Sequence, residues 1–225
     1  MTATIAPTRP PSRPRRRIAT TIGVLLLLGG LAVMGYFAWE YFGTNIVAKH
    51  KQAQIKAQTL RQWDKGVDGD AIAMLRVKRF GKDYEVPIVK GFDKGALARG
   101  VGWDTKSAKP GEIGNFAIAG HRVTHGEPFS KFPKLKKGDL VVVETRRDIF
   151  TYRLRNSGTS ITVSFTTPWP LWRVPDPAAR NRRPTERLIT MLTCSELFHT
   201  NNRSVVIGEL VKAYDKKERT TTTSG

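Results

Sequence analysis

The chain has 225 residues, of which 40% are hydrophobic and 25% are charged, and it contains a single cysteine. This composition is typical of a globular domain with an extension, and a lone cysteine excludes an intramolecular disulfide framework. The formal net charge of +19 indicates an acidic neighbour, such as nucleic acid, anionic lipid or an anionic wall polymer.

A basic segment and then a long apolar run form the start of the chain. Residues 1–17 contain five arginines and no acid, and residues 18–39 contain no charge. At about 1.5 Å per residue the apolar run reaches about 33 Å, enough for a hydrocarbon core of about 30 Å. Aromatic residues cluster at its far end, so the positive-inside rule predicts a single-pass membrane anchor at 18–39 with a cytoplasmic tail at 1–17. A cleaved signal peptide is the alternative, but its apolar region is usually only about 7–15 residues long.

The segment after the anchor is expected to be helical. Residues 40–66 are rich in Ala, Gln and Lys, which favour a helix, but their apolar positions form no clean stripe. We therefore expect an extracytoplasmic, solvated stalk that lifts the rest of the chain off the membrane. The main folded domain is expected at 67–214, and a disordered polar tail at 215–225.

From residue 71 the pattern changes to short β-prone runs separated by turn residues. The predicted strands are 71–77, 84–89, 114–120, 139–145, 149–154, 160–165, 188–193 and 204–211. Short strands at this spacing favour a closed barrel or a sandwich over a parallel α/β sheet. The connection at 166–187 holds five prolines and two tryptophans, Trp169 and Trp172. We expect it to form one wall of a binding groove, or else a surface loop whose tryptophans pack on the barrel.

The only cysteine, Cys194, follows one of the predicted strands, and Arg203 begins the next apolar run. Outside the cell, a lone thiol is an intermolecular link, a buried inert residue or a nucleophile. His121 follows another predicted strand, and His125 and His199 are further candidate partners. A neighbouring imidazolium or guanidinium favours the thiolate, histidine can protonate a leaving amine, and arginine can stabilise an oxyanion.

Other kinds of site fit the sequence less well. The pair His121 and His125 would need a helix to bind one metal ion, and Gly120, Gly126 and Pro128 argue against a helix there. The long connection offers only two acids to calcium. We therefore expect no metal and no cofactor, and we expect no nucleic-acid partner because the domain is predicted to lie outside the cell.

Residues 188–203, LITMLTCSELFHTNNR, resemble the signature of the sortases, the cysteine transpeptidases of Gram-positive envelopes. Their motif TLxTC reads Thr-Met-Leu-Thr-Cys here, with Met191 in place of the leucine. His121 in GNFAIAGHR and Arg203 match the histidine and arginine of the family. The resemblance covers residues 71–211, extends to the N-terminal anchor, and is strongest to class E. Class E members often have a tyrosine shortly after the histidine, where His125 stands in this chain.

The resemblance implies an eight-stranded sortase-type β-barrel with short helices, preceded by the anchor and the helical stalk. It implies that Cys194 attacks the Thr–Gly carbonyl of an LPxTG-like or LAxTG-like sorting signal, while Arg203 stabilises the oxyanion and His121 protonates the departing amine. The partners would be secreted proteins with C-terminal sorting signals and an amine acceptor on lipid II or peptidoglycan. The substrate-binding residues expected with this reading are Thr193, Leu192, His125, Trp169 and Trp172. The alternatives are a pilin-polymerising sortase and a non-catalytic, membrane-anchored envelope-binding module.

Overall fold

The computed structural model describes residues 14–194 and 201–216, and the chain divides into two compact units, residues 1–40 and 41–225. The first unit contains helix α1, Pro14–Ala38. Within α1, the 22 residues Arg17–Ala38 are long and apolar enough to cross a membrane, and none of the most apolar window is buried. A helix that is apolar all round belongs in a protein core or in a membrane, so exposure excludes a core helix and leaves a membrane span or a signal sequence.

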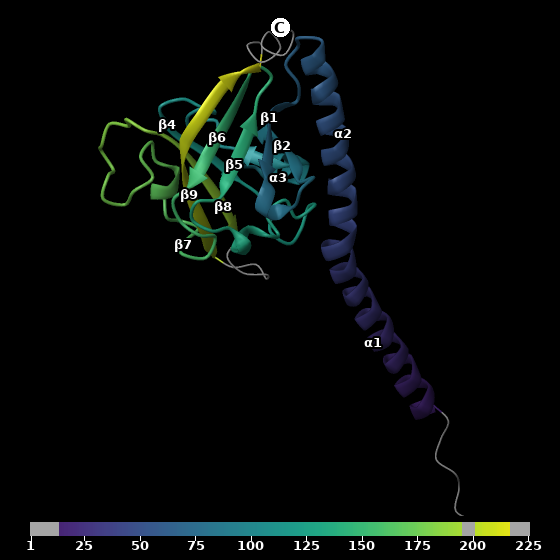
Figure 1. The fold of residues 1–225 in the computed structure, drawn as a ribbon. Helices are drawn as coiled ribbons and strands as arrows, with labels where there is room; N and C mark the ends of the chain where they lie inside the picture. Colours follow the sequence, from purple (N-terminus) through teal and green to yellow (C-terminus); the bar gives the residue numbers. More distant parts are fainter. Residues whose placement is uncertain (1–13, 195–200, 217–225) are drawn as a thin grey trace, which may run out of the picture. The chain divides into compact units, whose positions relative to one another are not determined.

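The second unit is mainly β-structure, and Figure 1 shows its strands wrapped into a barrel. A π-helical turn, Trp39–Gly43, connects α1 to helix α2, Thr44–Asp64. The strands among the described residues are β1 Ala71–Val77, β2 Glu85–Lys90, β3 Val101–Trp103, β4 Gly114–Ala119, β5 Leu140–Glu144, β6 Asp148–Leu154, β7 Thr162–Ser164, β8 Arg187–Cys194 and β9 Asn202–Asp215. The short helices are η2 Lys78–Phe80, α3 Lys94–Arg99, η3 Phe132–Lys134 and η4 Trp169–Leu171.

Eight of these strands form a closed ring, in the order β6-β5-β1-β2-β3-β4-β8-β9, which β9 closes by pairing with β6. The predicted eight-stranded barrel is therefore confirmed, although its membership differs from our expectation. The predicted strand at 160–165 corresponds to β7, which pairs with β9 outside the ring. The eighth ring strand is instead β3, whose three residues are too few to show an alternating pattern.

Local sequence explains how the ring is connected. Asp93 caps helix α3 by accepting a hydrogen bond from the backbone N–H of Ala96 at 3.0 Å. The antiparallel strands β5 and β6 are joined by a turn in which the N–H of Thr145 donates to the carbonyl of Asp148 at 2.8 Å and the hydroxyl of Thr145 accepts from the N–H of Asp148 at 2.9 Å. Crossovers make two pairs parallel, β2 with β3 and β4 with β8. The second of these pairs determines which ends of the strands meet at the site described below.

The barrel interior is one continuous cluster of buried apolar side chains. Nearly every residue of β4 is buried, as expected for a strand covered on both faces. The largest side chains that are fully enclosed are Tyr152, Phe116, Phe129, Phe132, Met74, Leu75, Ile88, Ile118, Leu135, Leu154, Ile189 and Met191. This packed interior leaves the strand ends and the connecting loops as the places where chemistry is possible.

Helix α2 belongs to the second unit and is not the solvated stalk that its polar sequence indicated. One face of the helix is buried, at positions three or four residues apart: Asn45, Ala48, Gln52, Ile55 and Thr59. Ile55 packs with Ala71 and Met74 of β1, and Lys56 forms an ion pair with Glu85 of β2 at 2.5 Å. Because three of the five buried positions are polar, the buried face left no hydrophobic stripe in the sequence.

Candidate active site

The backbone register of β4, β8 and β9 brings the three predicted catalytic positions to one end of the barrel. Strands β4 and β8 are parallel, with Ala119 opposite Leu192, so His121 and Cys194 both come two residues after this pair. Strands β8 and β9 are antiparallel, with Cys194 opposite Arg203. Adjacent strands lie about 4.8 Å apart, so Cys194 at the end of β8 has His121 on one side and Arg203 on the other. The side chain of Cys194 and all of His199 lie outside the described residues.

Two hydrogen bonds tie the end of β8 to the residue that precedes His121. The hydroxyl of Thr193 donates to the carbonyl of Gly120 at 2.8 Å, and the N–H of Gly120 donates to the carbonyl of Leu192 at 3.1 Å. Thr193 is buried, whereas Leu192 is partly exposed. We expected Thr193 to contact substrate, but its hydroxyl already binds the protein backbone. The structure therefore gives Thr193 a role in holding the strand ends together.

The loop after β4 carries both histidines and brings their rings together. The rings of His121 and His125 stack with their centroids 4.5 Å apart and their planes inclined by 21°. The carbonyl of His121 accepts a hydrogen bond from the N–H of Phe129 at 2.9 Å. A β-carbon on Gly120 would lie 2.9 Å from the Phe129 ring, so a glycine is needed where the loop leaves the strand. The described contact of His125 with the site is therefore the stacking of its ring on the ring of His121.

Arg203 has an aromatic neighbour that sequence reasoning missed. Its guanidinium carbon lies 6.0 Å from the centroid of the Phe165 ring, and its Nη1 donates to the carbonyl of Asn202 at 2.9 Å. Phe165 follows β7, which pairs with β9 at Arg203, and its side chain is 58% exposed. An exposed aromatic ring against a guanidinium favours the cation and orients it. The only signal in the sequence was an aromatic residue at the end of a predicted strand.

The two tryptophans of the long connection are not brought to this end of the barrel by any described contact. The side-chain amide of Asn115 donates to the carbonyls of Pro170 and Trp172, at 2.8 Å and 2.9 Å. Asn115 lies at the start of β4, six residues before His121, which is roughly 20 Å along a strand. The Trp172 ring contacts the guanidinium of Arg180. These contacts favour the alternative of a surface loop for Trp169 and Trp172 over a groove wall beside Cys194.

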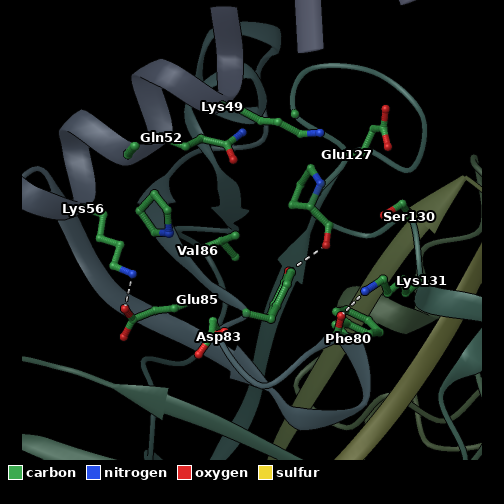
Figure 2. Close-up of a pocket in the computed structure, with 15 residues that line it drawn as sticks. Lys49, Gln52, Lys56, Phe80, Asp83, Glu85, Val86, Glu127, Ser130 and Lys131 are labelled. Atoms are coloured by element: carbon green, nitrogen blue, oxygen red, sulfur yellow. Dashed lines mark hydrogen bonds and ion pairs between the residues drawn. The ribbon is translucent and has the colours of Figure 1, made fainter. Parts of the chain in front are cut away.

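A pocket of about 410 Å³ lies between α2, the start of β2 and the segment 126–131 (Figure 2). Lysines 49, 56 and 131 line it together with Asp83, Glu85 and Glu127, so its charges balance. The Tyr84 hydroxyl donates to the carbonyl of Pro128 at 2.6 Å, and burial raises its pKa well above the ordinary value. His121 and Arg203 are not among the described residues that line this pocket. The pocket therefore borders the loop after β4 at Gly126 and Glu127 and is distinct from the candidate catalytic end of the barrel.

Comparisons with known proteins show which family and which relatives this chain resembles. A family model described as the sortase domain matches residues 75–211. Sortase SrtE1 of Streptomyces coelicolor is 32% identical over 89% of this chain and 57% of its own length, so this chain spans little more than half of that relative. Sortase SrtE2 of the same organism is 29% identical over 91% of this chain and 86% of its own length. The structure of sortase E from Streptomyces avermitilis superposes with a TM-score of 0.58 at 30% identity, covering 66% of this chain and 93% of that one.

Proposed function

The chain belongs to the sortase family, with class E sortases among its relatives, and we propose that it is a membrane-anchored transpeptidase acting through Cys194, His121 and Arg203. The observation that carries the proposal is the register that sets Cys194 opposite Arg203 on one side and level with His121 on the other. A nucleophile between an acid–base group and a cation is the arrangement that acyl transfer needs. His121 lies 73 residues before Cys194 in the sequence, so the pairing of β4 with β8 brings these two positions together.

In the proposed first half-reaction, the Cys194 thiolate attacks the carbonyl carbon of the Thr–Gly bond in a sorting signal of the LPxTG or LAxTG kind. The carbonyl oxygen becomes an oxyanion, which the Arg203 guanidinium stabilises. His121, as the imidazolium, donates a proton to the glycine nitrogen as the carbon–nitrogen bond breaks. The products are a thioester on Cys194 and a peptide with a free amine.

In the proposed second half-reaction, an amine attacks the thioester carbon. Neutral His121 takes the proton that the amine loses, the carbon–sulfur bond breaks, and the thiolate is regenerated. The acceptor amine would belong to lipid II or peptidoglycan, so that secreted proteins become anchored to the cell wall. Water in place of the amine gives hydrolysis of the same thioester.

The N-terminal helix supports a location at the membrane. The span Arg17–Ala38 is long enough to cross the hydrocarbon core, and arginines precede it in the sequence. By the positive-inside rule, the N-terminus is cytoplasmic and the barrel is extracytoplasmic. Sorting-signal proteins and a lipid-linked acceptor would then share the outer leaflet with the enzyme.

Peptide turnover tests this proposal. The full-length chain in detergent is incubated with quenched fluorescent peptides containing LPETG or LAETG, with and without an amine acceptor. We expect cleavage between Thr and Gly, and a new amide product when the amine is present; the ratio of the two rates gives the peptide preference. A folded protein that cleaves neither peptide with either acceptor would contradict the proposal and would favour a non-catalytic envelope-binding module.

A further inference from the structure

The loop that follows His121 has an uncommon backbone. Three consecutive residues, His125, Gly126 and Glu127, have positive φ angles of 53°, 84° and 52°. Only glycine adopts this left-handed region without strain, and other residues remain there when their surroundings hold them. The question is therefore which groups hold residues 125–127 in this conformation.

Two side chains of α2 bind this loop. Asn45 accepts a hydrogen bond from the N–H of Gly126 at 2.8 Å, and its amide group donates to the carbonyl of Val123 at 3.1 Å and to the carboxylate of Glu127. Gln52, two turns further along the helix, donates to the carbonyl of His125 at 3.0 Å. Both side chains are buried, with 7% and 6% of their surface exposed. Buried side-chain amides that form hydrogen bonds with one loop fix the conformation of its backbone.

The contact between α2 and this loop is polar. The pocket described above opens beside it, and Figure 2 shows Lys49 and Gln52 extending from α2 toward the segment that carries Glu127. A β-carbon on Gly126 would lie 2.7 Å from Nε2 of Gln52, so the helix and the loop are in close contact at Gly126. Hydrogen bonds, more than apolar packing, therefore hold the loop in place.

The held loop in turn presents one histidine to the other. The His125 ring stacks on His121, and its Nδ1 lies 3.0 Å from the hydroxyl of Thr124. A change in the backbone at residues 125–127 would move the His125 ring away from His121. The described contacts thus run without a gap from α2, through the loop, to the histidine that is level with Cys194.

Given the proposed function, we propose that α2 positions the catalytic histidine, with Asn45 and Gln52 as positioning residues. The described hydrogen bonds of both side chains go to residues 123–127 of the loop. They hold the left-handed loop that places His125 against His121 and thereby keep the His121 ring oriented toward the end of β8. Asn45 lies five residues after Glu40, the end of the first unit, so this contact comes immediately after the predicted anchor.

The test compares Asn45→Ala and Gln52→Ala with Thr59→Ala in the full-length chain in detergent. Thr59 is a matched control because it is buried on the same helix but accepts its hydrogen bond from Ala71 of β1, away from the loop. We expect Asn45→Ala and Gln52→Ala to lower kcat about tenfold with KM within about twofold of wild type, since a misplaced catalytic group slows the chemical step more than binding. Thr59→Ala should lower the melting temperature and leave kcat unchanged.

Hydrogen–deuterium exchange provides a readout that needs no substrate. Amides 122–129 should exchange faster in Asn45→Ala and Gln52→Ala than in wild type, and at the wild-type rate in Thr59→Ala. Wild-type kcat in both loop variants, or an equal loss of kcat in Thr59→Ala, would overturn the positioning role. If the wild-type protein turns over no peptide, the proposed function fails, and exchange alone decides the inference: unchanged exchange in both loop variants overturns it.

Discussion

Two neighbouring regions of this barrel hold the proposed catalytic groups by different means. At the end of β8, Cys194 and Arg203 are the last pair of a ladder that runs through seven registered pairs from Leu188. The loop after β4, in contrast, is held by side chains of α2 and has three left-handed residues in succession. A ladder depends on backbone groups that only a substitution by proline removes, whereas the loop depends on a few replaceable side-chain amides. Of the three positions His121, Cys194 and Arg203, we therefore expect His121 to be the one most easily displaced by substitutions elsewhere in the chain.

The largest effect should come from the nucleophile. Cys194→Ala should lower peptide turnover by on the order of 10³-fold or more, since no thioester can form. The melting temperature should stay close to wild type, because the backbone pair with Arg203 remains. Turnover and thermal unfolding of the same preparation test both statements, and a variant that keeps its activity would show that Cys194 is inert.

Arg203→Lys should have the next largest effect. Lysine keeps the positive charge but loses the planar guanidinium that stacks on Phe165 and presents several donors to an oxyanion. Loss of one oxyanion donor typically costs about 10²-fold to 10³-fold in kcat. Steady-state kinetics should show the loss in kcat. The exposed Arg153 of β6 provides the control, and Arg153→Lys should leave kcat unchanged.

Phe165→Ala probes how the arginine is held on its β7 side. A partly exposed cation–π contact contributes about 0.5–1 kcal/mol, so kcat/KM should fall about twofold to fivefold. Phe165→Tyr keeps an aromatic face and should retain wild-type kcat/KM. Equal activity in the alanine and tyrosine variants would mean that β9 alone orients Arg203.

The smallest effect concerns the docking of α2 at low pH. Burial by itself would raise the pKa of Glu85, but the hydrogen bond from Lys56 and the charge of Arg76 outweigh it and leave the pKa below its ordinary value of 4.5. The ionised Glu85 carboxylate therefore stabilises the folded state above about pH 4.5. This contribution is lost as the pH falls through the lower pKa that Glu85 has in the folded state. Glu85→Gln should destabilise the full-length protein by about 1 kcal/mol or less at pH 7.

Thermal unfolding at several pH values measures this difference. The gap in melting temperature between wild type and Glu85→Gln should be widest near pH 7 and should narrow below pH 4.5, where the carboxyl of wild type becomes protonated. A gap of the same size at both ends of the range would mean that the Lys56–Glu85 pair contributes nothing to the docking of α2.

The sequence was most informative where strands bear the site. Short β-prone runs favoured a barrel or a sandwich, and the resemblance to the sortases implied the eight-stranded barrel. The same runs placed His121, Cys194 and Arg203 each at the end or the start of a predicted strand. Strand β3 was not predicted, because three residues are too few to show an alternating pattern. The contact of the exposed Phe165 with Arg203 was not predicted, because the two residues are 38 positions apart in the chain. Only the pairing of β7 with β9 brings them together.

The sequence was least informative where polar residues are buried. Asn45, Gln52 and Thr59 form most of the buried face of α2, so hydrophobic periodicity indicated a solvated helix. Thr193 was expected to face substrate, but a hydroxyl at a strand end serves the neighbouring backbone equally well, and its bond to Gly120 is a tertiary contact. Hydrogen bonds between distant segments leave no periodic signal in the sequence. The contacts of Asn45 and Gln52 with the loop that follows His121 were therefore seen only in the structure.

The most direct test of the central claim is the mass of the enzyme during turnover. Full-length protein is mixed with an excess of the preferred peptide, quenched in acid within seconds, and measured by intact-mass and peptide-mapping spectrometry. We predict an added mass equal to the acyl part of the peptide up to its threonine, located on Cys194, absent from Cys194→Ala and removed by an added amine. An active protein with no adduct on Cys194, or with the adduct on another residue, would contradict the assignment of the active site to this end of the barrel.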